Sequence, residues 1–156
     1  MTTGHYHSKH KTMLIETQNG DCIEVSDDIV HTWLTIHNMI ETSDAIDCLP
    51  LSNVTTKVLN LLLQWSELIE TLVLDEYKLT KEEIAFFNDM DKDTLFELGN
   101  TANYLNIPTL LNGYINYNRD KMTKMSAEQM REYMDVEDDF TEEEHAELEK
   151  ELSFIR

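Results

Sequence analysis

Two apolar stripes at helical spacing dominate the hydrophobic pattern in the second half of the chain. The first recurs every three or four residues, at Leu95, Leu98, Ala102 and Leu105. The second follows directly, at Ile107, Leu110, Leu111, Tyr114 and Ile115. Pro108 fits the first turn of a helix, where its missing N–H has no intrahelical partner, and Asn106 supplies a break before it. The pattern predicts two helices joined by a tight turn, with more apolar surface than such a hairpin covers alone.

The N-terminal third predicts a small sheet. Two β-prone runs, Met13–Thr17 and Cys22–Val25, flank Asn19-Gly20, which is the preferred centre of a type I′ hairpin. The register between the runs leaves a bulged or longer turn open. Residues 49–51, Leu-Pro-Leu, predict a short edge strand, because proline cannot donate in a central ladder.

Helical segments fill most of the chain before the hairpin. Short helices are predicted over 26–33 and 34–41, and the second would bury Ile36, Met39 and Ile40. Asn53 is placed to cap a long amphipathic helix that follows it. Thr80 and Glu83 form a capping box that opens a further helix.

Composition narrows the kind of partner. Twelve Lys and Arg residues against 31 Asp and Glu give a formal net charge of −19, which repels nucleic acid and anionic membranes and favours a basic protein partner. No apolar run reaches the roughly 18 residues of a membrane span, and the N-terminus lacks the apolar core of a secretory signal. Cys22 and Cys48 are too few for a disulfide framework, so we expect reduced cysteines and a cytoplasmic and nuclear location.

One acidic run resembles the start of a metal-binding loop. Asp89, Asp91 and Asp93 begin like a calcium loop, but Thr94 replaces the required glycine and Asn100 the bidentate glutamate. We interpret the run as a solvent-exposed helix cap. With no Gly-rich phosphate loop or nucleophile elbow in the sequence, we expect no enzyme, no metal and no cofactor.

The last thirty residues are more acidic than the rest of the chain. Ser126 with Gln129 and Thr141 with Glu144 form two capping boxes, each opening a helix. Twelve acidic residues lie between 128 and 151, so we predict that 126–156 is poorly ordered when the protein is alone. Four methionines lie close together, at Met122, Met125, Met130 and Met134. They are either gap-filling core or an adaptable surface for partner helices.

Several of these stretches resemble one known family. Residues 95–98 (Leu-Phe-Glu-Leu), 102–105 (Ala-Asn-Tyr-Leu) and 139–144 (Asp-Phe-Thr-Glu-Glu-Glu) are similar to the S-phase kinase-associated protein 1 family. Upstream, residues 49–54 and Gln64-Trp65 occur in the expected order, and the similarity covers about 13–151. These proteins are the F-box-binding adaptors of SCF cullin-RING ubiquitin ligases.

The resemblance implies an α+β, mostly helical chain with a BTB/POZ fold. A small N-terminal sheet would pack among helices, and two further helices would extend the C-terminus. The implied parts are a flexible N-terminus over 1–11, a BTB/POZ domain over 12–123 and an F-box-binding extension over 124–156. In the family, the BTB/POZ part binds a cullin, while the hairpin and the extension together bind the F-box.

Carried over by position, the resemblance assigns the F-box-binding residues as Phe96, Gly99, Leu111, Ile115, Asn118, Met130, Phe140 and Phe154. It places Asn103 and Tyr104 on or near the cullin-facing side. Three of these positions depart from the family. Gly99 replaces a bulky aliphatic residue that faces the partner, Asn118 replaces an aliphatic with a polar group, and Phe154 replaces a tryptophan.

Two alternatives stay open beside the cullin–F-box adaptor. One is an F-box-binding scaffold that works outside a cullin ligase. The other is an adaptor similar to elongin C, which shares the BTB/POZ core but lacks the two extra helices, so residues 126–151 argue against it. A weak homodimer of the free chain is also left open.

Overall fold

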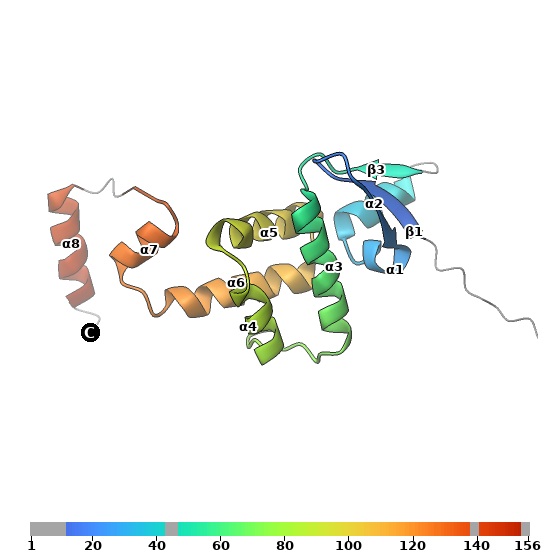
Figure 1. The fold of residues 1–156 in the computed structure, drawn as a ribbon. Helices are drawn as coiled ribbons and strands as arrows, with labels where there is room; N and C mark the ends of the chain where they lie inside the picture. The colour runs from blue at the N-terminus through green and yellow to red at the C-terminus, as the bar shows by residue number, and fades with distance from the viewer. Residues whose placement is uncertain (1–11, 43–46, 138–140, 154–156) are drawn as a thin grey trace, which may run out of the picture. The chain divides into compact units, whose positions relative to one another are not determined.

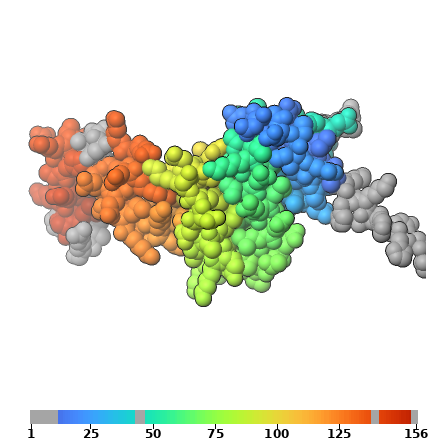
Figure 2. Space-filling model, in the orientation of Figure 1, coloured from blue at the N-terminus to red at the C-terminus, as the bar shows by residue number. Residues whose placement is uncertain are grey.

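The computed structural model describes residues 12–42, 47–137 and 141–153. Helices predominate, and a small sheet lies near the N-terminus (Figure 1), so the prediction of an α+β, mostly helical fold is confirmed. The chain divides into two compact units, Met1–Asn118 and Arg119–Arg156. In the first unit, the N-terminal segments and α3 (Thr56–Glu70) form one packed body (Figure 2). No helix among the described residues is long and apolar enough to cross a membrane.

Three short strands form the sheet, in the order β2-β1-β3. β1 (Thr12–Glu16) pairs antiparallel with β2 (Cys22–Ser26) and parallel with β3 (Cys48–Pro50). Alternation along the strands turns Ile15, Val25 and Leu49 into the core. The predicted edge strand is therefore confirmed, and both cysteines are free.

The turn between β1 and β2 is longer than a type I′ turn. Glu16 pairs with Cys22, and of the central pair only Gly20 has a positive φ, +83°. Asn19 instead uses its side chain, whose Oδ1 accepts a hydrogen bond from the Thr56 N–H at 3.0 Å. Of the two possibilities that the sequence left open, the strict type I′ turn is therefore wrong and the longer turn is confirmed, with the Asn19 side chain bonded to the start of α3.

Two short helices follow the sheet. α1 (Asp27–Val30) and α2 (Leu34–Thr42) bury Val30 and Ile36. Ile40 is half-buried against the core, but Met39 is 41 % exposed. The prediction that Met39 is buried is therefore wrong.

The cap of α3 lies two residues beyond the predicted one. Thr55 accepts a hydrogen bond from the Val58 N–H at 3.2 Å, so the prediction that Asn53 caps this helix is wrong. The Val54 carbonyl accepts from the Gln18 N–H at 2.8 Å, and the Val54 N–H donates to the Leu51 carbonyl at 3.2 Å. These bonds hold residue 54 in a turn, so the helix begins later.

Aromatic rings fill the core between α3 and α4 (Lys81–Asn88). The Trp65 ring lies 5.3 Å from Phe86 and 5.6 Å from Phe87, measured between ring centroids. The capping box that opens α4 is confirmed, with Thr80 and Glu83 bonded to each other's backbone N–H at 3.2 and 2.7 Å. These contacts join α4 to α3 in the first unit.

The predicted helical hairpin is confirmed. α5 (Lys92–Leu105) ends at Asn106, which adopts the left-handed conformation at φ 52°, ψ 67°. The Ile107 N–H then donates to the Ala102 carbonyl at 3.0 Å, which closes the end of the helix. α6 (Pro108–Met122) begins at the predicted proline.

The second unit holds α7 (Ala127–Tyr133) and α8 (Glu142–Ser153). The capping box of Ser126 with Gln129 and that of Thr141 with Glu144 are both confirmed. Neither helix has a buried residue among those described. This unit therefore has little core of its own.

Candidate partner-binding site

Five of the predicted F-box contacts lie on α5 and α6, and we call them the hairpin face: Phe96, Gly99, Leu111, Ile115 and Asn118. Ile115 is 53 % exposed, while Phe96 and Leu111 are half-buried. Gly99 and Asn118 are buried. The hairpin face therefore offers one prominent apolar side chain and two partly covered ones.

The burial of Gly99 has a specific cause. A Cβ atom added to Gly99 would collide with Tyr114 Cζ and lie 2.6 Å from both Cε atoms of that ring. The Tyr114 ring of α6 thus fills the space beside α5 that a side chain at 99 would need. The ring therefore occupies the space beside α5 where the resemblance places a bulky aliphatic side chain.

The sequence pattern placed Tyr114 in the second apolar stripe but did not reveal that its ring lies over Gly99. The only signal was a glycine inside a helix, where it lowers stability by about 1 kcal/mol relative to alanine. Asn118 is also accommodated locally, because its Nδ2 donates to the Tyr114 carbonyl at 2.9 Å. Its polar side chain therefore has a partner within α6.

Asn103 and Tyr104 lie on the last turn of α5 and are exposed, Tyr104 at 49 %. The Thr35 hydroxyl donates to the Tyr104 carbonyl at 3.0 Å, and the Leu34 N–H donates to the Asn106 carbonyl at 3.2 Å. These bonds fix the start of α2 to the end of α5. Leu34 is exposed there as well, which sequence reasoning did not anticipate.

In the second unit, Met130 of α7 is half-buried. Phe140 and Phe154, the other two predicted contacts, lie outside the described residues. Met134, Leu148 and Leu152 expose apolar side chains, and a groove of about 620 Å³ is lined partly by the two leucines. The acidic extension therefore leaves apolar surface uncovered.

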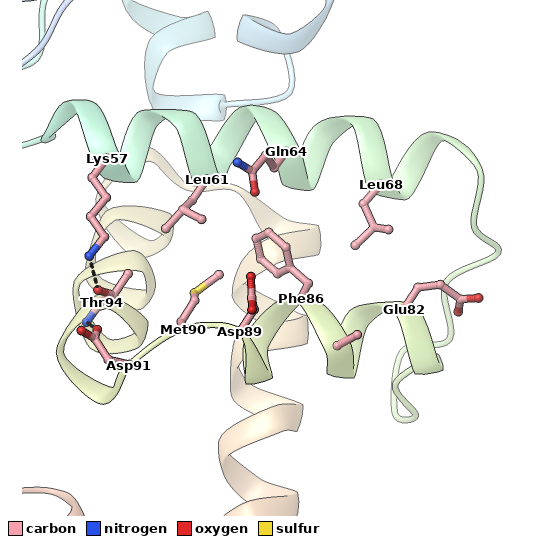
Figure 3. A pocket seen from close by; sticks show the side chains of 11 residues that line it. Lys57, Leu61, Gln64, Leu68, Glu82, Phe86, Asp89, Met90, Asp91 and Thr94 are labelled. Atoms are coloured by element: carbon pink, nitrogen blue, oxygen red, sulfur yellow. Dashed lines mark hydrogen bonds between the residues drawn. The ribbon is translucent and has the colours of Figure 1, made fainter.

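A groove of about 790 Å³ lies between α3, α4 and the start of α5 (Figure 3). Its apolar side chains are Leu61, Leu68, Ala85, Phe86 and Met90. At one end, Lys57 Nζ donates to Thr94 Oγ1 at 2.9 Å, and Asp91 accepts from the Thr94 N–H at 2.8 Å. Hydrogen bonds from Thr94, side chain and then backbone, lower the pKa of the Asp91 carboxyl.

These contacts explain the acidic run as part of a helix start. Asp91 is the N-cap of α5, as the sequence interpretation required. Within the described part of the chain, no group of three or more His, Cys, Asp or Glu side chains is arranged to hold a metal ion. Lys57 and Asp91 thus have evident structural roles.

Comparison with known proteins identifies the family of the chain. Residues 11–70 match the tetramerisation domain of the Skp1 family, and residues 120–154 match the dimerisation domain of the same family. SKP1-like protein 14 of Arabidopsis thaliana is 31 % identical over 140 residues, which cover 89 % of this chain and 93 % of that protein. The chain belongs to the Skp1 family. SKP1-like proteins 18 and 12 of the same plant are 29 % and 30 % identical, each over 89–90 % of this chain and 92–94 % of their own length.

Membership confirms the resemblance and the BTB/POZ fold expected for the N-terminal part. The second family match covers α7 and α8, the two helices that an elongin C-like adaptor lacks. The Skp1 family is a family of non-catalytic adaptors of SCF-type ubiquitin ligases. The general role of this chain is accordingly that of an adaptor.

Proposed function

We propose that this Skp1-family chain bridges a cullin to F-box substrate receptors in an SCF-type ubiquitin ligase. The main support is that a single helix, α5, includes candidate contacts for both partners. Phe96 lies in its second turn and Tyr104 in its last. Eight residues of helix separate them by about 12 Å, at 1.5 Å per residue.

The proposed mechanism is geometric. An F-box helix would lie on the hairpin face, with Ile115 and Phe96 as apolar anchors. Met130, Phe140 and Phe154 of the extension, residues 124–156, are proposed as further contacts for the same F-box. The cullin would contact the BTB/POZ part, residues 12–123, at Asn103 and Tyr104. The adaptor then holds the receptor at a fixed distance from the catalytic end of the ligase.

No residue of this chain is proposed to catalyse a reaction, and no cofactor is required. The net charge of −19 favours partners with basic contact surfaces. We place the complex in the cytoplasm and the nucleus.

The cullin contact is tested by Tyr104→Ala. We expect about tenfold weaker binding to a purified cullin N-terminal fragment, because an exposed aromatic anchor at an interface contributes on the order of 1–2 kcal/mol. Binding to an F-box segment should not change. Biolayer interferometry with each immobilised partner measures both affinities.

Tyr77→Ala is the matched control, since Tyr77 is an exposed tyrosine between α3 and α4. Equal cullin affinity for Tyr104→Ala and Tyr77→Ala would remove Tyr104 from the proposed contact. If the unmodified chain binds the F-box segment but no cullin fragment, the scaffold alternative replaces the bridging function.

A further inference from the structure

The Gly99–Tyr114 contact makes one residue of the hairpin face, Gly99, depend on a neighbouring residue of α6. No side chain fits at 99 while the Tyr114 ring lies where it does, since even a Cβ would approach two ring carbons to 2.6 Å. Tyr114 is half-buried and packs against the core. Gly99 therefore allows the ring to lie across α5, and the ring forms the surface at this point.

The hydroxyl of Tyr114 is the distinctive group on this surface. It makes no hydrogen bond with the described residues, and none of their buried side-chain nitrogen or oxygen atoms lacks a partner. The hydroxyl is therefore in contact with solvent. Burial raises the pKa of the Tyr114 phenol above its ordinary value of 10.0, so at neutral pH it is an uncharged group that both donates and accepts.

Two apolar side chains lie on the same side of α6 as Tyr114. Leu111 precedes Tyr114 by three residues and Ile115 follows it, so the three project from one side of the helix. A partner helix that covers Leu111 and Ile115 would extend over Tyr114 and remove its hydroxyl from solvent. If the partner presents only carbon there, the hydroxyl loses its water without replacement, which weakens binding.

We propose that Tyr114, held across Gly99, selects partner helices that place one hydrogen-bonding side chain within an otherwise apolar contact face. Suitable side chains are Asp, Glu, Asn, Gln, Ser and Thr. This inference rests on the proposed function, in which the hairpin face binds an F-box helix. It adds the chemistry by which this chain discriminates among such helices.

The dependence of the ring on Gly99 is tested by a double-mutant cycle of Gly99→Ala and Tyr114→Ala. Gly99→Ala alone should lower the melting temperature by about 3 °C or more, because the new methyl group displaces the ring. In the Tyr114→Ala background the same change should raise it slightly, because alanine favours the helix. An equal decrease in both backgrounds would overturn the proposed packing.

The selection itself is tested with Tyr114→Phe, which keeps the ring. The probe is a recombinant F-box segment and a set of its variants, each with one apolar contact residue changed to glutamine. The unmodified chain should tolerate glutamine at one position, and Tyr114→Phe should bind that variant at least fivefold more weakly. The parent segment, apolar at that position, should bind Tyr114→Phe at least fivefold more tightly.

The outcomes separate the two claims. If the F-box segments bind but Tyr114→Phe changes no affinity more than twofold, the selection by Tyr114 is wrong and the proposed function stands. If no F-box segment binds either protein, both are wrong. If Tyr114→Phe alters self-association by sedimentation instead of F-box affinity, the face belongs to a homodimer and the inference is again overturned.

Discussion

Replacing Trp65 with alanine is expected to remove about 3–5 kcal/mol from the free energy of unfolding. The Trp65 side chain is 1 % exposed and lies against both Phe86 and Phe87. Its Nε1–H also donates to Thr109 Oγ1 at 3.1 Å, which joins α3 to α6. A loss of this size is a large part of the roughly 5–15 kcal/mol typical of a folded domain.

Urea unfolding followed by circular dichroism measures this effect. Thr109→Val is the control that removes only the hydrogen bond, with an expected cost of about 1 kcal/mol. Trp65→Phe retains most of the ring volume and should lie between the two. If Trp65→Ala were no more destabilising than Thr109→Val, the aromatic core between α3 and α4 would not have the importance assigned to it.

The second large effect is expected on the hairpin face. Phe96→Ala and Ile115→Ala should each weaken binding of an F-box segment about 30-fold, which corresponds to roughly 2 kcal/mol for an interface anchor. Ile115 projects into solvent in the free chain, so its removal should affect binding more than folding. Cullin affinity should be unchanged, and titration calorimetry measures both affinities.

Ile84→Ala provides the matched control. Ile84 is 38 % exposed on α4 and lies outside the hairpin face, so the same truncation there should leave F-box binding unaltered. The melting temperature of each variant separates lost contacts from lost structure. Full F-box affinity in both Phe96→Ala and Ile115→Ala would show that the docking surface lies elsewhere.

Features encoded by neighbouring residues could be predicted from the sequence. The hairpin follows from Asn106 and Pro108, whose effects act within one turn of helix. The capping boxes, such as Thr80 with Glu83, need only a spacing of three residues. Family membership could likewise be predicted, because the resembling stretches occur in order along most of the chain.

Features that depend on distant residues could not be predicted. Asn19 does not form a type I′ turn because its side chain bonds to Thr56, 37 residues away. Residue 54 stays outside α3 because its carbonyl bonds to Gln18. At the candidate site, the sequence drew attention to Gly99 but could not reveal that Tyr114 covers it.

The central claim is that one chain holds an F-box protein and a cullin at the same time, and sedimentation velocity tests it most directly. The chain is first mixed with a recombinant F-box segment, and a cullin N-terminal fragment is then added. The account predicts one species whose mass equals the sum of one copy of each of the three chains. Two separate binary complexes, with the cullin fragment displacing the F-box segment, would contradict it.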